Sequence, residues 1–200
     1  MREGEIADAL TAAFREYASE PAYQPIVGSG VNGTVLHYLD NDAVVKEGDL
    51  IVIDCAAAYG GYTSDVSRTL PAGGTFTAEQ REIYEIVLAA QLAGVAAARP
   101  GATVTDVDTA ARAVIDNAGY EDYFIHGTGH QLGIEVHDAT PDGPLKPGMV
   151  LTIEPGIYLP ERGFGVRIED DILITESGNR DLTAAVPKNV AAIEAAMARR

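Results

Sequence analysis

An internal repeat is the feature that most constrains how this chain folds. Residues 46–54 form a turn and an apolar run that ends in a carboxylate, and residues 146–154 repeat this order. Upstream, a Gly-Ser-Gly segment at 28–30 is matched by Gly-Thr-Gly at 127–129. Because both matches share nearly the same offset of about 100 residues, they predict two structurally related halves.

The hydrophobic pattern predicts an α+β composition for each half. We place the halves at 1–76 and 77–200 of one domain, because no linker or low-complexity tract separates them. Helical spacing and capping residues predict helices at 4–18, 77–99, 105–117 and 189–199. Apolar runs predict strands at 26–27, 34–38, 50–57, 66–70, 134–137, 150–153, 156–159, 166–169 and 172–175.

The two halves differ at their beginnings. The second half opens with the long helix 77–99, capped by Thr77 with Gln80 three residues on. The first half has only Met1 before the segment that corresponds to the end of that helix. The repeat therefore predicts a fold that lacks its first helix, either because the chain is truncated or because something else covers that flank.

Composition narrows the possible partners. The chain has 30 Asp and Glu against 14 Lys and Arg, a net charge of −16, which repels nucleic acid and anionic membranes, so we expect no binding to either. The single cysteine, Cys55, excludes an intrachain disulfide and a multi-cysteine zinc site. The N-terminus does not resemble a signal peptide, and no apolar run reaches the ~20 residues of a membrane span. We expect a cytoplasmic protein.

Strand pairing in the first half sets two carboxylates on one face. A two-residue turn between Tyr59 and Tyr62 would pair these residues across a hairpin. The same register puts Asp54 opposite Ser67, and Asp65 on the face of Asp54 because it lies two residues from Ser67. We expect the two aspartates to be diagonal neighbours, roughly 7–8 Å apart.

The second half repeats this arrangement. With a turn at 160–163 that sets Leu159 opposite Phe164, Glu154 falls directly opposite Glu169. Facing like charges destabilise a sheet, and burial makes this worse unless the groups are protonated or neutralised by a cation. Four unrelated, solvated acids are the alternative, which the apolar strands around them disfavour.

Repeat symmetry would bring both carboxylate pairs to a shared centre. Four carboxylates with one or two imidazoles suit divalent cations, Mn²⁺ first and Co²⁺, Zn²⁺ or Fe²⁺ as alternatives. Two such ions could share bridging carboxylates and activate a water. His130 and His137 are seven residues apart, so one straight strand cannot aim both at one face, but Gly133 permits a bend. We expect one histidine to be a ligand and the other to face substrate, and their spacing does not decide which.

These motifs resemble those of aminopeptidase P and prolidase, the Xaa-Pro metallopeptidases whose catalytic domain has the pita-bread fold. The resemblance covers nearly the whole chain in order, through residues 26–38, 54–69, 126–138, 152–158 and 166–171. It implies an α+β pita-bread fold, with two pseudo-symmetric halves and a curved antiparallel sheet covered by helices. It also implies that the domain usually preceding this one is absent.

The resemblance implies a complete set of metal ligands for two divalent ions: Asp54, Asp65, His130, Glu154 and Glu169. Asp65 and Glu169 would bridge the ions, His130 and Glu154 would complete one site, and Asp54 would complete the other. A metal-bridging hydroxide would attack the scissile carbonyl. Glu154 would take the proton of that nucleophile and relay it to the leaving proline nitrogen.

The remaining site residues also follow from the resemblance. His37 and His137 would donate to substrate and tetrahedral intermediate, and His126 would be a further pocket residue. Arg167 and Tyr158 resemble a supporting pair, in which the guanidinium orients Asp54; simple charge balance is the alternative for Arg167. Peptides with proline at the second position would be the substrates, and a homo-oligomer is possible. The competing hypotheses are a non-catalytic peptide- or protein-binding module, an inactive truncated fragment, and a different metal-dependent hydrolase of the same fold.

Overall fold

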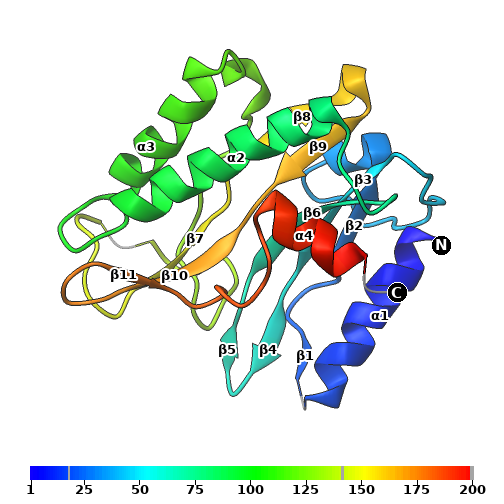
Figure 1. The fold of residues 1–200 in the computed structure, drawn as a ribbon. Coiled ribbons are helices and arrows are strands. Elements are labelled where there is room, and N and C mark those ends of the chain that lie inside the picture. Colours follow the sequence, from blue (N-terminus) through cyan, green and yellow to red (C-terminus); the bar gives the residue numbers. More distant parts are fainter. Residues whose placement is uncertain (18, 141, 199–200) are drawn as a thin grey trace.

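The computed structural model describes residues 1–17, 19–140 and 142–198. Its helices, including the short 3₁₀ helices, are α1 (Glu3–Glu16), η1 (Gly30–Thr34), α2 (Ala78–Ala97), α3 (Val104–Asn117), η2 (Glu121–Tyr123), η3 (Pro160–Arg162) and α4 (Val190–Met197). Its strands are β1 (Glu20–Pro21), β2 (Ile26–Ser29), β3 (Leu50–Cys55), β4 (Ala57–Tyr59), β5 (Tyr62–Thr63), β6 (Val66–Pro71), β7 (Val150–Ile153), β8 (Gly156–Leu159), β9 (Phe164–Arg167), β10 (Asp170–Ile174) and β11 (Asn179–Asp181). Figure 1 shows their arrangement.

The four predicted helices are present near their predicted bounds. The capping box at the start of α2 is confirmed, because the Thr77 hydroxyl accepts from the Gln80 N–H and the Gln80 side chain accepts from the Thr77 N–H. Residue 18 of the first predicted helix and residue 199 of the last lie outside the described residues. None of the helices in the described ranges has the length and apolarity needed to cross a bilayer.

The strand predicted at 34–38 is wrong. The chain forms the 3₁₀ helix η1 over residues 30–34, and the N–H of Val35 then donates back to the carbonyl of Asn32. Gly30 has a φ of +58°, a left-handed conformation that glycine adopts without strain and that turns the chain out of β2. The backbone groups are therefore bonded locally rather than to a neighbouring strand.

The strand predicted at 134–137 is also wrong, because this segment folds back on itself. Gly133 donates its N–H to the carbonyl of Glu135, and the Asp138 carboxylate accepts from the N–H of Ile134 at 3.0 Å. A single bridge between Gln131 and Asp138 closes the loop. An Asp side chain that bonds nearby backbone competes with strand pairing, which explains why an apolar run here does not form a ladder.

Two related antiparallel sheets confirm the repeat. The first sheet has the order β2-β3-β6 and the second the order β7-β10-β11. Residues 128–132 run beside β7 as β2 runs beside β3, since the backbone carbonyl of His130 accepts from the Thr152 N–H and that of Thr128 accepts from the Glu154 N–H. The predicted registers are confirmed: Asp54 pairs with Ser67, and Leu159 pairs with Phe164.

In the second half, the strand pairing is interrupted between the β8–β9 ladder and the β7–β10 ladder, at the position of the two glutamates. The β8–β9 ladder ends at the pair Gly156–Arg167, and the β7–β10 ladder starts at the pair Ile153–Asp170 in the same register. Glu154 and Glu169 thus fall at the break. There the N–H of Glu169 donates to the carbonyl of Ser67 in β6, which joins the two halves of the sheet.

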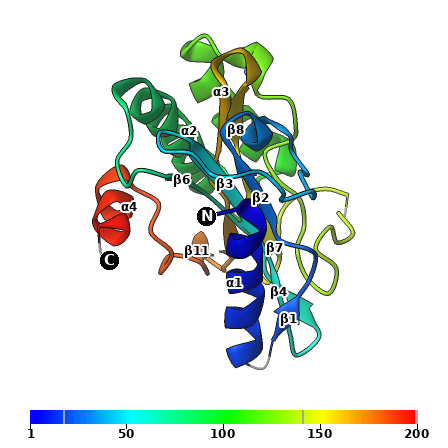
Figure 2. The same cartoon turned by 90° about the vertical axis from the view of Figure 1, so that its right-hand side faces the viewer.

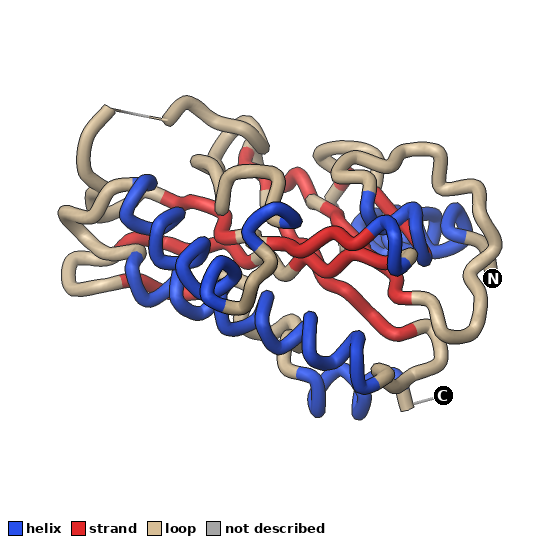
Figure 3. The backbone as a smooth tube through the Cα atoms, turned by 90° about the horizontal axis from the view of Figure 1, so that it is seen from above, coloured by secondary structure: helices blue, strands red, loops and turns tan. Residues whose placement is uncertain are grey.

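Helices pack on the strands and leave one face of each central strand for the site. Ala7 of α1 packs on Ile51 of β3, and Val107 of α3 packs in one cluster with Leu151 and Ile153 of β7. Because side chains alternate along a strand, Asp54 and Thr152 face the other way. Figure 3 shows α1 beside the strands of the first half, with α2 and α3 beside those of the second. Figure 2 shows that α4 lies on the same side of the molecule as α2, while α1 lies away from both.

The helices also show where the halves differ. α1 and α3 correspond, because each precedes the Gly-rich segment of its half. The described residues of the first half contain no helix that corresponds to α2.

Candidate metal centre

A cavity of about 660 Å³ opens where the two halves meet. Its walls hold eleven polar residues: Asp54, Asp65, Glu154, Glu169, His37, His126, His130, His137 and Arg167, together with Tyr23 and Glu135. Tyr158 lies behind this wall and contacts both His126 and Arg167 through its hydroxyl. The structure therefore brings together every side chain that the sequence singled out for the site.

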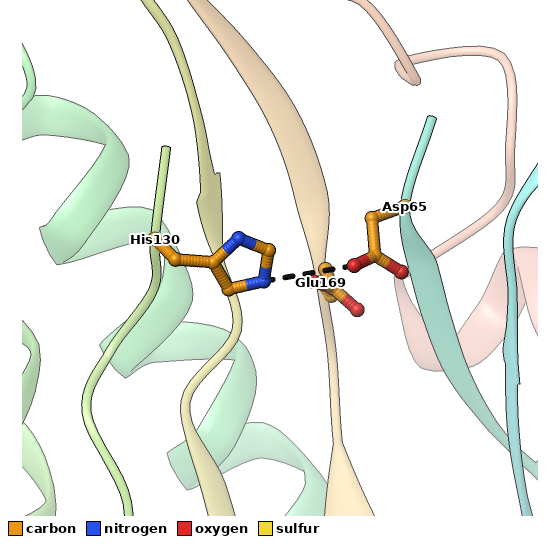
Figure 4. Close-up of side chains that lie close together, drawn as sticks. All are labelled: Asp65, His130 and Glu169. Atoms are coloured by element: carbon orange, nitrogen blue, oxygen red, sulfur yellow. Dashed lines mark ion pairs between the residues drawn. The ribbon is translucent and has the colours of Figure 1, made fainter. Parts of the chain in front are cut away.

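The densest part of the site combines residues from both halves. One donor atom each of Asp65, His130 and Glu169 lie within 4.8 Å of one another. Figure 4 shows these three side chains pointing toward one another from separate segments. The Nε2 atom of His130 is also 3.6 Å from Asp65 Oδ2 and 3.5 Å from Glu154 Oε1.

The hydrogen bonds of His130 determine which of its nitrogens can bind a cation. Its Nδ1 is 3.0 Å from the carbonyl oxygen of Gln131, and a carbonyl can only accept. Nδ1 therefore carries the proton, and the lone pair of Nε2 faces the carboxylates in the neutral ring. Burial lowers the pKa of His130, which favours this neutral form. A metal-binding histidine is oriented in the same way by a bond from its other nitrogen.

The carboxylates carry more negative charge than the protein around them compensates. Burial raises the pKa of Asp65 to about 8, and the charge of Asp54 adds to this effect. Burial likewise raises the pKa of Glu154 to about 7 and that of Glu169 well above its ordinary value. A divalent cation would remove this repulsion, and oxygen-rich sites with an imidazole suit Mn²⁺ and its neighbours. The residues present therefore fit a divalent metal.

Tyr23 belongs to the site, although the sequence analysis missed it. Its hydroxyl contacts Oδ1 of Asp54 and lies 2.5 Å from Oδ1 of Asp65. One hydroxyl proton cannot serve two carboxylates fully, so this contact also points to a shared proton or cation. Tyr23 belongs to none of the motifs in the sequence. The pairing of Ile26 with Asp54 brings it beside Asp54, so only the register of β2 against β3 could have predicted its place in the site.

Arg167 is buried and contacts residues of both halves. Its Nη2 donates to Asp54 Oδ2 at 2.8 Å, and its Nη1 lies 3.3 Å from both the Tyr158 hydroxyl and the carbonyl oxygen of Leu36. The contact between the guanidinium and Asp54 is thus present, and its contribution to metal binding stays a prediction.

The other three histidines line the cavity in different environments. His126 Nδ1 lies 2.8 Å from the carbonyl oxygen of Gly127, so its Nε2 accepts from Tyr158 at 2.8 Å. Burial lowers the pKa of His126 to about 4, which keeps the ring neutral. The ring of His137 packs edge-on against that of His130, with centroids 4.1 Å apart. His37 and His137 are exposed to the cavity, as groups that contact substrate must be.

Known proteins are similar to this chain in sequence. The Xaa-Pro aminopeptidase of Escherichia coli is 41% identical over an alignment of 226 positions, gaps included, which takes in 98% of this chain and 51% of that protein. The Xaa-Pro dipeptidase of Pyrococcus furiosus is 46% identical over 188 residues, which cover 91% of this chain and 53% of that protein. The chain spans about half the length of the curated relatives it matches.

Solved structures give the same result. The aminopeptidase PepP of Pseudomonas aeruginosa superposes with a TM-score of 0.94 at 39% identity, over 99% of this chain and 52% of the other. A zinc-substituted E. coli aminopeptidase P in complex with product superposes with a TM-score of 0.93 at 38% identity, over 98% of this chain and 52% of the other. The sequence profile of metallopeptidase family M24 matches residues 1–176. The chain, with its pita-bread fold, belongs to metallopeptidase family M24.

Proposed function

We propose that this chain hydrolyses the peptide bond that precedes proline, in peptides or dipeptides with proline at the second position, with two divalent cations. The observation that carries the proposal is the buried carboxylate cluster with a neutral histidine whose lone pair faces it. The Xaa-Pro aminopeptidase and dipeptidase relatives support the choice of substrate.

The proposed ligands are the five residues Asp54, Asp65, His130, Glu154 and Glu169. Their donor set is four carboxylates and one imidazole, for which we propose Mn²⁺ before Co²⁺, Zn²⁺ or Fe²⁺. We infer that Asp65 and Glu169 would be shared between the two ions, since they are the two carboxylates in the cluster of three donors that joins the halves and each has two oxygens. When bound, the cations would polarise the scissile carbonyl and lower the pKa of water at the site.

The side chains around the ligands would complete the reaction. Glu154 lines the cavity with its Oε1 3.5 Å from His130 Nε2, and its carboxylate would accept the proton of the attacking water and return it to the leaving proline nitrogen. His37 and His137 face the cavity and would donate to the carbonyl oxygen and its tetrahedral form. Arg167, which itself bonds the Tyr158 hydroxyl, would hold Asp54 through its guanidinium.

Two measurements on the whole chain test this function. Titration of metal-free protein with Mn²⁺, followed by calorimetry and metal analysis, should show two ions per chain. The loaded protein should cleave an Xaa-Pro peptide and leave the matched Xaa-Ala peptide intact. No stoichiometric binding of Mn²⁺, Co²⁺, Zn²⁺ or Fe²⁺ would overturn the metal centre.

A Glu154→Gln variant separates catalysis from binding. The substitution keeps the shape of the side chain but removes both the proton acceptor and one proposed carboxylate ligand, so turnover of protein shown by metal analysis to hold its Mn²⁺ should fall by ~10²–10⁴-fold. Cleavage at the wild-type rate would rule out Glu154 as the base. If wild-type protein binds metal and Xaa-Pro peptide without cleaving it, the chain is a binding module and the proposed hydrolysis fails.

A further inference from the structure

Ser67 lies at the point where the two halves of the site exchange hydrogen bonds. It is fully buried in β6, directly opposite Asp54 in the β3–β6 ladder. Its hydroxyl oxygen is 2.8 Å from Arg167 Nε and 2.8 Å from Glu169 Oε2. The Ser67 hydroxyl thus lies between the guanidinium of Arg167, at the end of β9, and the carboxylate of Glu169, just before β10. A buried hydroxyl between two charged groups has a role beyond packing.

The direction of both bonds is fixed by the chemistry of the partners. A guanidinium N–H can only donate, so the Ser67 oxygen must accept from Arg167. The hydroxyl has one proton, which is then left for Glu169 Oε2. The hydrogen-bond chain therefore runs from Arg167 through Ser67 to Glu169, and it fixes the orientation of the Glu169 carboxylate.

The same guanidinium also holds a carboxylate of the other half. Nη2 of Arg167 donates to Asp54 Oδ2 at 2.8 Å. The guanidinium of Arg167 is itself held in place, because its Nη1 lies 3.3 Å from both the Tyr158 hydroxyl and the carbonyl oxygen of Leu36. One buried arginine thus reaches one ligand of each half, Asp54 directly and Glu169 through a hydroxyl.

We propose that Ser67 is a positioning residue that transmits the fixed orientation of Arg167 to the carboxylate of Glu169 and so sets the geometry of the metal centre. This inference rests on the proposed divalent-cation site. Groups that hydrogen-bond to metal ligands typically change metal affinity or activity by about 10–100-fold when they are removed. Without the hydroxyl, Arg167 Nε and Glu169 Oε2 both lose a buried partner.

Three variants separate the hydroxyl from its surroundings. Ser67→Ala removes the hydroxyl, and Ser67→Thr keeps it on a side chain that strands favour. Thr69→Val is the matched control, because Thr69 is also fully buried in β6 and its hydroxyl bonds only the backbone N–H and carbonyl of Arg167. Circular dichroism and thermal unfolding should first establish that each protein is folded.

The first measurement is Mn²⁺ binding to the metal-free proteins by calorimetry. Ser67→Ala should bind Mn²⁺ about 10–100-fold more weakly, as expected for a lost ligand support. Ser67→Thr should stay within about threefold of wild type, and Thr69→Val should unfold at a lower temperature with its Mn²⁺ affinity within about threefold. The visible absorption of Co²⁺-loaded Ser67→Ala should also differ from that of wild type, because that spectrum reports ligand geometry without catalysis.

The second measurement is hydrolysis of an Xaa-Pro peptide at saturating Mn²⁺. Ser67→Ala should lower kcat more than it raises KM, since the hydroxyl contacts a metal ligand and not the substrate. Equal Mn²⁺ affinity and an equal Co²⁺ spectrum for wild type and Ser67→Ala would overturn the inference, as would a Ser67→Thr protein that is folded yet as weak as Ser67→Ala. If wild type itself binds no Mn²⁺, the proposed function fails instead.

Discussion

Glu169 and Asp170 are neighbours in sequence but face two different acidic clusters. The metal-face cluster consists of Glu169 with Asp54, Asp65 and Glu154. The paired cluster, on the other face, consists of Asp170 and Asp181 with Arg68 and Lys188. Asp170 is fully buried and lies 2.6 Å from both Arg68 Nη2 and Lys188 Nζ. Successive residues of an extended chain point to opposite faces, which keeps the two clusters apart.

The difference shows where the fold supplies its own cations. Asp170 also accepts from the Gln91 amide at 2.8 Å and the Thr183 hydroxyl at 2.7 Å, so both its oxygens are fully engaged. The pKa of Glu169, in contrast, is raised well above its ordinary value by burial and by the charges of Glu154 and Asp65. Among the described residues, the metal-face cluster has four carboxylates and only the guanidinium of Arg167, on Asp54, to balance them, so it is arranged for a cation from outside.

The largest effect should come from breaking the paired cluster. Asp170→Asn removes the charge that Arg68 and Lys188 share, and loss of one partner of a buried ion pair costs about 3–5 kcal/mol. The metal-free variant should therefore show this loss in free energy of unfolding, measured by urea denaturation. A loss below about 1 kcal/mol would mean that the two clusters do not differ as described.

The next residue supplies a matched control for that variant. Asp171 is also buried in β10, but its Oδ1 has no hydrogen-bond partner among the described residues, and burial raises its pKa to about 7. Asp171→Asn removes a carboxyl that is already costly to ionise, so the metal-free protein should change by less than about 1 kcal/mol at pH 7.

The second effect is a dependence of metal-free stability on pH. The folded pKa values of Asp65 and Glu154, about 8 and about 7, lie above the unfolded values near 4. Their contribution to stability is therefore complete below the unfolded values and is lost as pH rises through 7 and 8. The free energy of unfolding should fall by about 4 kcal/mol between pH 6 and pH 9. Saturating Mn²⁺ should remove this fall, and metal-free stability that rises over the same range would contradict the comparison.

The third effect should have the opposite sign to the first. Asp65→Asn removes one uncompensated charge, so metal-free protein at pH 9 should gain about 1–2 kcal/mol in free energy of unfolding. The same variant at pH 5 is its own control, because Asp65 is then protonated and the gain should vanish. The variant should also lose the stabilisation by Mn²⁺ that wild type shows. If the variant is less stable than wild type at pH 9, the charge of Asp65 is compensated by groups of the protein, which contradicts the comparison.

Much of the metal-face cluster could be predicted from the sequence because strand register is simple arithmetic. The turns at 60–61 and 160–163 fixed which residues face each other, and Asp54, Ser67, Glu154 and Glu169 followed. The loops at 34–38 and 134–137 could not be predicted in this way, because apolar runs there bond their backbone locally.

The paired cluster and Tyr23 were not predicted, for a different physical reason. Lys188 and Thr183 belong to the segment after β11, which no repeat or periodicity ties to β10. Tyr23 precedes β2 and reaches Asp54 only through the β2–β3 pairing. Contacts set by long-range packing of irregular segments leave no local pattern in a single sequence.

The smallest effect should come from Asp108, a half-exposed carboxylate between the two extremes. Its Oδ2 lies 2.8 Å from Arg112 Nε, and its Oδ1 accepts from the N–H and hydroxyl of Thr128, two residues before His130. Burial opposes its charge, but the bonds from Thr128 and Arg112 lower its pKa overall. Its contribution to stability is thus present above the ordinary aspartate value and is lost as pH falls.

Asp108→Asn should cost about 1 kcal/mol in free energy of unfolding at pH 7, because the amide turns a donor toward Arg112 while keeping one acceptor for Thr128. Asp106→Asn is the control, since Asp106 is an exposed residue of the same helix α3 that bonds only Thr103. It should change stability less and leave Mn²⁺ affinity at the wild-type value. If Asp108→Asn costs as much as Asp170→Asn, burial is not what separates the balanced clusters, and the comparison loses its physical basis.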